Sequence, residues 1–182
     1  MSHPVVIIQA RMQSVRLPGK VLLPLCGHPL LWHIVQRCRA AEGIAEVVVA
    51  TTTQPADDAI VGLCQLAGIA YFRGSEPDVL DRYYQAALAY DADPVLRVTG
   101  DCPLVMPALI TNVLRCLEGG YFDLVGANAG AGVTAGWRYP DGMDTEGFTR
   151  ETLWWLWRFA PMGEAREHVS LYALSHPEDV RI

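Results

Sequence analysis

Disulfide pairs, metal-binding clusters and long apolar runs are all missing from this sequence of 182 residues. The five cysteines stand at least twelve residues apart, and none belongs to a CxxC motif or to a Cys/His cluster with metal-ligand spacing. No apolar run approaches the roughly 18 residues of a membrane span, and no basic segment precedes the short apolar stretch near the N-terminus. We therefore expect a cytoplasmic protein with reduced, mostly buried thiols, and neither a membrane span nor a secretory signal.

Positive charge is also scarce overall, because 20 Asp and Glu outnumber 14 Lys and Arg and give a net charge of −6. This balance argues against a general nucleic-acid-binding protein, which needs an electropositive face. The first 41 residues are the exception, with five basic side chains and no acidic one: Arg11, Arg16, Lys20, Arg37 and Arg39. An anion-binding site would lie most naturally in this segment.

Strand and helix patterns alternate along most of the chain. Apolar, β-branched runs predict strands at residues 4–9, 46–51, 69–72, 94–99 and 122–127. Amphipathic runs predict helices at residues 29–41, 55–67, 77–90, 107–117, 149–159 and 164–174. The alternation implies βαβ units, and hence one domain over residues 1–182 with an α/β fold, a three-layer α/β/α sandwich around a mainly parallel sheet. Because ligands of such sheets bind beyond the carboxyl ends of the strands, the loops after Gln9, Thr51, Phe72 and Thr99 should meet at one cleft.

The loop after the first predicted strand, ARMQSVRLPGK, combines the groups that bind phosphate. Arg11, Ser14, Arg16 and Lys20 lie within ten residues, and Lys20 is the only lysine in the chain. Backbone donors, a guanidinium and a compact ammonium suit a triphosphate. A solvated loop paired with surface acids is the alternative, but the spacing and the acid-free surroundings favour phosphate. The loop matches neither GxxxxGK[ST] nor GxGxxG, which disfavours a P-loop ATPase and a Rossmann dehydrogenase.

Two groups of carboxylates come later in the chain. Asp101, just after the predicted strand at 94–99, suits Mg²⁺ with phosphates as the other ligands, although an Asp that closes a turn before Pro103 has the same pattern. Asp141, Asp144 and Glu146 lie together in PDGMDTE. They would bind the acceptor substrate or a metal, or they would belong to an Asp-Gly turn followed by a strand, and the sequence favours neither.

Two helix patterns carry further interpretations. In RGSEPDVLDRYY, Ser75 followed by Asp78 predicts a capping box with Ser75 as the N-cap. In TRETLWWLWRF, three tryptophans within four positions exceed what one buried stripe can cover. Part of this helix should therefore face either the partner subunit of a homodimer or a large local core.

Six segments resemble, in order, the motifs of the cytidylyltransferases that make CMP-activated sugars, in particular those of the spore coat polysaccharide biosynthesis protein F branch. They run from residue 7 to about residue 170, and they are QARMQSVRLPGKVLLPLCGHPLL, ATTTQPADDAIVGLC, FRGSEPDVLDRYYQAA, RVTGDCPL, PDGMDTE and REHV. The resemblance implies a fold of the nucleotide-diphospho-sugar transferase type. It also implies CTP and Mg²⁺ as partners, and transfer of CMP to a sugar hydroxyl with loss of pyrophosphate.

The resemblance further implies roles for individual residues. The catalytic set, which would hold the triphosphate and the metal, is Arg11, Arg16, Lys20 and, as the metal ligand, Asp101. The other nucleotide contacts would come from Ala10, Ser14, Arg73 and Thr99, with Arg97 near the base. The acceptor sugar would be bound by Asp81, Arg82, Asp141, Asp144, Glu146 and His168.

The sequence departs from the resemblance in two places. Gln13 and Val15 replace the usual Gly and Thr of the first motif, which removes a hydroxyl and predicts weaker binding. Relatives continue past the segment that matches DVRI to a second metal-binding aspartate, and we expect this chain to lack that C-terminal segment. The protein would then be truncated, use another acid in that role, or be incompetent in catalysis.

The leading hypothesis is a cytidylyltransferase that transfers CMP from CTP to an acidic or modified sugar for surface polysaccharide. The first alternative is a glycosyltransferase that uses a nucleotide-sugar on the same architecture. Its Asp-x-Asp metal motif has one match, DAD at residues 91–93, which precedes the strand at 94–99 rather than following it. The second alternative is a non-catalytic nucleotide-binding module. We expect no nucleic-acid or membrane partner.

Overall fold

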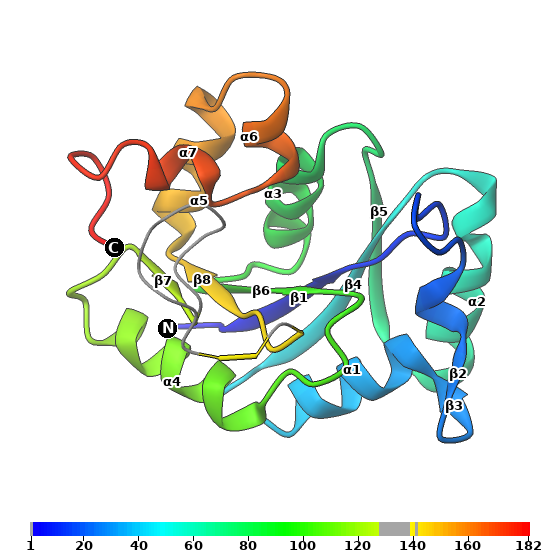
Figure 1. Ribbon diagram of the computed structural model, residues 1–182. Helices are drawn as coiled ribbons and strands as arrows, with labels where there is room; N and C mark the ends of the chain where they lie inside the picture. Colours follow the sequence, from blue (N-terminus) through cyan, green and yellow to red (C-terminus); the bar gives the residue numbers. More distant parts are fainter. Residues whose placement is uncertain (1, 128–138, 141) are drawn as a thin grey trace.

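A six-stranded sheet forms the middle layer of the computed structural model, which describes residues 2–127, 139–140 and 142–182. Its strand order is β5-β4-β1-β6-β8-β7 (Figure 1). Four neighbouring strands run parallel, namely β5 (Ala70–Gly74), β4 (Glu46–Thr52), β1 (Val5–Gln9) and β6 (Val95–Thr99). β8 (Glu146–Phe148) is antiparallel to its two neighbours, β6 and β7 (Leu124–Gly126). The predicted, mainly parallel sheet is confirmed, with one antiparallel strand inserted near an edge.

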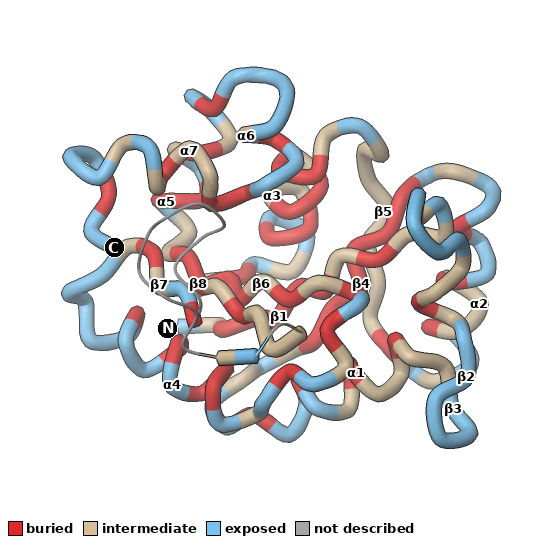
Figure 2. Tube along the Cα trace, in the orientation of Figure 1, coloured by how far each residue is buried: buried red, intermediate tan, exposed pale blue. Residues whose placement is uncertain are grey.

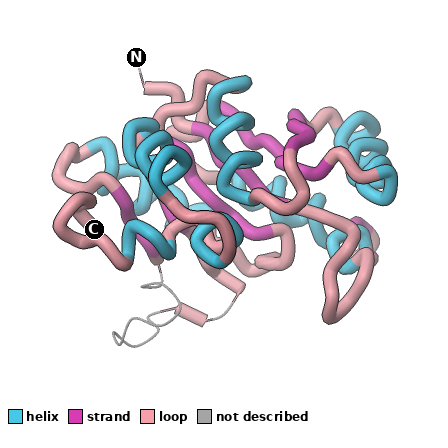
Figure 3. Tube along the Cα trace, turned by 90° about the horizontal axis from the view of Figure 1, so that it is seen from above, coloured by secondary structure: helices cyan, strands magenta, loops and turns pink. Residues whose placement is uncertain are grey.

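Helices cover both faces of the sheet. The view from above shows helices overlying the strands (Figure 3). One layer contains α1 (Leu30–Arg39), α2 (Asp58–Ala67) and α4 (Pro107–Glu118). The other contains α3 (Val79–Ala89), α5 (Arg150–Phe159), α6 (Glu164–Glu167) and α7 (Leu171–Leu174). Two 3₁₀ helices, η1 (Lys20–Leu22) and η2 (Pro55–Asp57), and a hairpin of β2 (Pro24–Leu25) and β3 (His28–Pro29) lie in the connections. The predicted three-layer α/β/α sandwich is confirmed. No described helix combines the length and the apolar character needed to cross a membrane.

The central strand β1 is buried on both faces because its apolar run is continuous (Figure 2). Val6 and Ile8 pack in the layer of α1, α2 and α4, and Val5 and Ile7 pack in the layer of α3 and α5. Such a strand belongs in the middle of a parallel sheet, where helices cover both faces. Because β1 and β6 are paired in parallel up to their last residues, the loops that follow them leave the sheet side by side.

Two local predictions about helix α3 and the chain after α5 are wrong. The N-cap of α3 is Asp78 rather than Ser75, because the Asp78 carboxylate accepts the backbone N–H of Asp81 at 2.8 Å. The predicted helix at 164–174 is two short helices, because the backbone leaves helical geometry at His168, with φ −103° and ψ 87°. The break lets Ser170 turn into the interior.

The hairpin of β2 and β3 has no counterpart among the predicted elements. It turns at Cys26 and Gly27, which both have positive φ, at 48° and 88°. Left-handed backbone at a non-glycine residue such as Cys26 is uncommon, so a sequence pattern does not predict a tight turn there.

The tryptophans of α5 divide between the core and the surface. Trp155 and Trp157 pack against the core, and Trp157 stacks on Tyr84 with ring centroids 4.6 Å apart. Trp154 is 47% exposed. The local core therefore covers two of the three rings, and association through this helix stays a prediction.

Gly147 in β8 faces α4 so closely that an added methyl group has no room. A Cβ there would lie 2.7 Å from both Leu117 Cδ1 and Val113 Cγ1. We expect Gly147→Ala to lower the free energy of unfolding by roughly 1–3 kcal/mol, as over-packing of a core does. Urea denaturation followed by circular dichroism measures the change.

The control is Gly62→Ala in α2, where a Cβ would meet no atom within 4 Å. Alanine favours a helix over glycine by up to about 1 kcal/mol, so this variant should be neutral or stabilised. Equal losses in the two variants would contradict the packing argument.

Candidate active site

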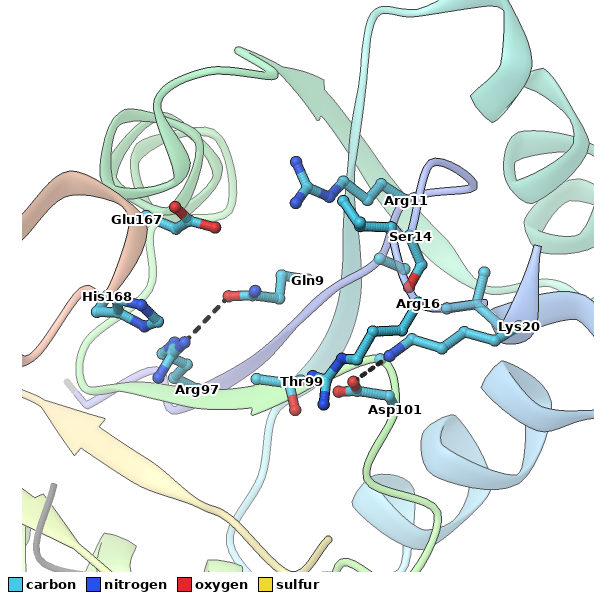
Figure 4. A pocket seen from close by; sticks show the side chains of 14 residues that line it. Gln9, Arg11, Ser14, Arg16, Lys20, Arg97, Thr99, Asp101, Glu167 and His168 are labelled. Atoms are coloured by element: carbon cyan, nitrogen blue, oxygen red, sulfur yellow. Dashed lines mark hydrogen bonds and ion pairs between the residues drawn. The ribbon is translucent and has the colours of Figure 1, made fainter. Parts of the chain in front are cut away.

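A cavity of about 390 Å³ opens at the carboxyl ends of β1 and β6 (Figure 4). Its walls come from the loop after β1, the loop after β6, and the turn between α6 and α7. The structure brings the following predicted site residues to it: Ala10, Arg11, Ser14, Arg16, Lys20, Thr99, Asp101 and His168. Segments far apart in the chain meet here because the parallel strands end at one edge of the sheet.

The loop after β1 is closed by the backbone of Met12. The Met12 carbonyl oxygen accepts the N–H groups of Ser14 at 3.0 Å and Gly19 at 2.8 Å. Gly19 has a φ of 71°, a left-handed conformation that a side chain would strain, and it leads directly into η1. The resulting turn brings Arg16 and Lys20 beside the loop after β6 (Figure 4).

Lys20 and Asp101 form an ion pair that joins the two loops, in which Lys20 Nζ donates to Asp101 Oδ2. Burial would raise the pKa of Asp101, but hydrogen bonds from Lys20 and Thr99 outweigh burial and hold that pKa below its ordinary value. The carboxylate is therefore ionised at neutral pH. With 40% of its side-chain surface exposed, it remains accessible to a ligand.

Arg11 and Arg16 carry positive charge that the protein does not neutralise. Over the described ranges, neither guanidinium has a hydrogen-bond or ion-pair partner. Both line the cavity together with Lys20. Guanidinium groups without a protein partner suit an anion, because the planar fork of a guanidinium matches two phosphate oxygens.

Gly100 lets the loop after β6 approach β1. Its N–H donates to the Gln9 carbonyl oxygen at 2.8 Å, and a Cβ at Gly100 would lie 2.6 Å from that same oxygen. Any side chain here would push Asp101 away from the loop after β1. Cys102, next in the chain, is a buried thiol whose pKa is raised to about 11, chiefly by burial. It is packed rather than nucleophilic, as the sequence predicted.

The end of the cavity away from Asp101 is polar and nearly balanced in charge (Figure 4). There Arg97 Nη1 pairs with Glu146 Oε2 at 2.6 Å, and Arg97 Nη2 donates to Gln9 Oε1 at 3.3 Å. Glu146 Oε1 in turn accepts the Ser170 hydroxyl at 2.7 Å. Burial would lower the pKa of Arg97, yet Glu146 more than offsets burial and raises it, so the guanidinium stays ionised. Glu146 therefore holds a residue of the cavity wall instead of lining the cavity itself.

Three further predicted residues do not line the cavity, because other contacts hold them. Arg73 donates to the carbonyl oxygens of Thr52, at the end of β4, and of Gln54, at 2.9 and 3.1 Å. Asp81 accepts the indole N–H of Trp157 at 2.8 Å. Arg82 is buried and donates to the Ser75 carbonyl oxygen. These residues brace the surrounding scaffold, and their roles in nucleotide or acceptor binding stay predictions.

The PDGMDTE segment contributes to the scaffold near the cavity. Asp144 Oδ2 lies 3.7 Å from Cys102 Sγ and does not line the cavity. Asp141 lies outside the described residues. The part of the segment from Glu146 onward is strand β8, as the alternative of a turn followed by a strand predicted.

Gln9 and Glu167 line the cavity, although the sequence pattern assigned them no role. Gln9 is the last residue of β1, a position from which a parallel strand presents its side chain to a ligand. Glu167 directly precedes His168 in the REHV segment. Glu167 ends α6 and His168 follows it. The helix is anchored by Arg166, whose guanidinium pairs with Asp78 at 2.7 Å.

Known proteins are similar to this chain in sequence and in fold. The pattern of the family described as Cytidylyltransferase matches residues 5–133, a range that includes β1, β6 and both loops of the cavity. The spore coat polysaccharide biosynthesis protein SpsF of Bacillus subtilis is 35% identical over 181 residues, which cover 97% of this chain and 72% of that protein. A 3-deoxy-manno-octulosonate cytidylyltransferase of an Anaeromyxobacter species is 40% identical over 124 residues, 66% of this chain and 49% of that protein.

A solved structure extends the comparison to three dimensions. The structure of a cytidylyltransferase from Leptospira borgpetersenii aligns with a TM-score of 0.87 at 32% identity. The alignment covers 98% of this chain and 74% of that chain. The shared architecture therefore extends over nearly all of this chain.

The pair of Arg97 and Glu146 generates a prediction about stability. Replacing Glu146 by Gln leaves a nearly buried guanidinium without a counter-charge, since the two side chains are only 13% and 15% exposed. We expect Glu146→Gln to lower the free energy of unfolding by about 3 kcal/mol, the low end of the range for a broken buried pair, because cavity water reaches Arg97. Urea denaturation measures the loss.

The matched control is Glu42→Gln, which breaks the exposed pair of Glu42 and Arg115, with side chains 79% and 65% exposed. An exposed pair contributes about 0–1 kcal/mol, so this loss should be small. If Glu146→Gln cost no more than Glu42→Gln, the buried pair would not have the structural role assigned to it.

Proposed function

Because the chain belongs to the cytidylyltransferase family and is thus a nucleotidyltransferase, we propose that it transfers CMP from CTP to a sugar hydroxyl and releases pyrophosphate. One observation carries the proposal. Arg11 and Arg16, unpaired within the described residues, line the same cavity as the ion pair of Lys20 and Asp101. A triphosphate supplies the negative charge that these cations lack.

The reaction needs positioning and charge more than covalent chemistry from the protein. The sugar oxygen bonds to the α-phosphorus, the bond from that phosphorus to the pyrophosphate oxygen breaks, and the hydroxyl proton is lost to solvent. Negative charge grows on the departing pyrophosphate. Arg11, Arg16 and Lys20 stabilise that charge because they are already directed at the place where it develops.

Magnesium is the expected partner of the triphosphate, and Asp101 fits the part of its single protein ligand. Over the described residues no three Asp, Glu, His or Cys side chains come together as a metal site. Mg²⁺ commonly uses one or two carboxylates and completes its coordination with phosphates and water. When bound, the ion would neutralise phosphate charge and make the α-phosphorus more electrophilic. The lowered pKa of Asp101 keeps its carboxylate ionised and ready for this role.

The acceptor sugar would occupy the end of the cavity that contains Gln9, Arg97, Glu167 and His168. These side chains offer both donors and acceptors, which suits a molecule with several hydroxyl groups. The names of two relatives, one of spore coat polysaccharide biosynthesis and one of 3-deoxy-manno-octulosonate, support an acidic or modified sugar for surface polysaccharide. His168 is the predicted acceptor-binding residue that reaches this end.

The Asp-x-Asp motif on which the glycosyltransferase alternative depends, DAD at residues 91–93, does not face the cavity. Asp91 pairs with Arg150 at 2.8 Å, and Asp93 accepts the backbone N–H of Arg150 at 3.2 Å. Both acids precede β6 and lie at the opposite end of that strand from Asp101. They hold the start of α5 instead of facing the cavity.

Removing one cation tests the proposal directly. We expect Arg16→Ala to raise the dissociation constant for CTP with Mg²⁺ at least tenfold, since a hydrogen bond to a charged group contributes about 1.5–3 kcal/mol. Isothermal titration calorimetry measures it. Arg39→Ala is the control, because Arg39 is exposed on α1 and donates to the Gly68 carbonyl oxygen away from the cavity.

Turnover is tested with the unmodified protein. Incubation with each nucleoside triphosphate, Mg²⁺ and a panel of sugars, followed by measurement of pyrophosphate, should give product with CTP and one sugar class. Tight CTP binding without pyrophosphate from any pair would contradict the proposal, as would wild-type CTP affinity in Arg16→Ala.

A further inference from the structure

Asp57 is a buried carboxylate outside the cavity whose contacts join two loops. It ends η2 and is 2% exposed. Its Oδ1 accepts the backbone N–H of Met12 at 2.7 Å, and its Oδ2 accepts the backbone N–H of Thr52 at 3.2 Å together with the Thr52 hydroxyl. Asp57 also stands at the N-cap position of α2, yet its side chain makes no capping hydrogen bond. Its oxygens therefore serve the loop after β1 and the end of β4 instead of the helix.

Met12 is the residue through which this contact reaches the cationic loop. Its N–H binds Asp57, and its carbonyl oxygen accepts the N–H groups of Ser14 and Gly19. The backbone of one residue thus fastens the loop to the scaffold and also closes it. Arg16 lies inside the closed turn, so release of the Met12 N–H would loosen the segment that carries this cation.

The charge of Asp57 has the wrong sign for a site that binds an anion. A carboxylate in the protein interior repels a nearby triphosphate, and that repulsion is screened less than it would be in water. A carboxylate does, however, offer two oxygens that only accept, and three donors converge on this position. The two acceptors match these donors, and the buried Arg82 also interacts electrostatically with Asp57, so a charged group is accommodated here.

We propose that Asp57 is a positioning residue that holds the triphosphate-binding loop in its binding conformation through the Met12 N–H. The effect on nucleotide affinity rests on the proposed function, whereas the contact itself does not. Asp57 touches neither the cavity nor, by this proposal, the nucleotide. It acts at a distance by fixing the backbone between Arg11 and Gly19.

Asp57→Asn separates geometry from charge. An amide has one accepting oxygen, and two donors, the N–H and the hydroxyl of Thr52, compete for it at the Oδ2 side. We expect the amide oxygen to stay with these two donors, because a flipped amide would leave both the N–H and the hydroxyl hydrogen of Thr52 without this acceptor. The amide nitrogen then faces the Met12 N–H, donor against donor, and the link to the loop is broken. If Asp57 mattered only as a negative charge, this variant would bind CTP more tightly. If Asp57 positions the loop, it binds CTP more weakly, by at least about tenfold.

Thr52→Val is the matched control. It removes a buried hydroxyl that bonds the same carboxylate, but it leaves the hydrogen bond from Met12 to Asp57 in place. Both variants should melt at a lower temperature than the wild type. Only Asp57→Asn should raise the dissociation constant for CTP with Mg²⁺ in calorimetry. Unchanged or tighter CTP binding in Asp57→Asn, or equal weakening in Thr52→Val, overturns the proposal.

Amide hydrogen exchange followed by NMR tests the contact without a nucleotide. In the wild type the Met12 N–H should exchange much more slowly than the N–H of Gln13, an exposed residue of the same loop, and in Asp57→Asn this protection should be lost. If the wild type failed to bind CTP, the proposed function would be wrong. The amide exchange of the Met12 N–H would still decide whether Asp57 holds the loop. If Asp57→Asn did not fold, the wild-type measurement would decide alone, because a Met12 N–H that exchanges as fast as that of Gln13 overturns the proposal.

Discussion

The cavity depends on the pairing of two parallel strands that end in register. Gln9 of β1 and Thr99 of β6 are partners in the sheet, and the loops beyond them are joined twice. Gly100 donates to the Gln9 carbonyl oxygen, and Lys20 donates to Asp101, which lies 81 positions away in the chain. The pairing of the strands brings the two loops together, so their side chains are close enough to bind one another directly. A site built on strand ends in this way takes its rigidity from the core beneath it.

The arginines near the cavity fall into two groups. Arg97 is matched by Glu146, and Arg166 by Asp78, in pairs that are largely withdrawn from solvent. Arg11 and Arg16 have no such partner in the part of the chain that the structure describes. The matched arginines organise the walls, and the unmatched ones carry the positive charge on which the proposed triphosphate site depends. A protein with a net charge of −6 can therefore still offer two unmatched guanidinium groups at one cavity, because local arrangement outweighs the overall sum.

Short segments of sequence were enough to predict five strands (β1, β4, β5, β6 and β7), most helices and the cationic loop, since apolar runs, amphipathic spacing and a cluster of basic residues are local patterns. The hairpin of β2 and β3 was not predicted. The rule that parallel strands end at one edge then placed that loop beside Asp101. The rest depends on partners far away in the chain. Glu146 turns toward Arg97, 49 positions distant, and the Asp57 carboxylate binds a backbone amide 45 positions distant. An acid at the start of a helix is typical of a cap, so nothing in the local pattern indicated that Asp57 serves another loop.

The strand order also governs how the chain must fold. Because β1 lies between β4 and β6, its apolar run finds its first partner only when residues 46–52 are available and its second only after residues 95–99. During synthesis at roughly 5–20 residues per second, the segment VVII waits several seconds with both edges open. Open, apolar edges of high β-propensity are templates for aggregation. The strand that leads into the cationic loop is thus also a part of the nascent chain that a chaperone would protect.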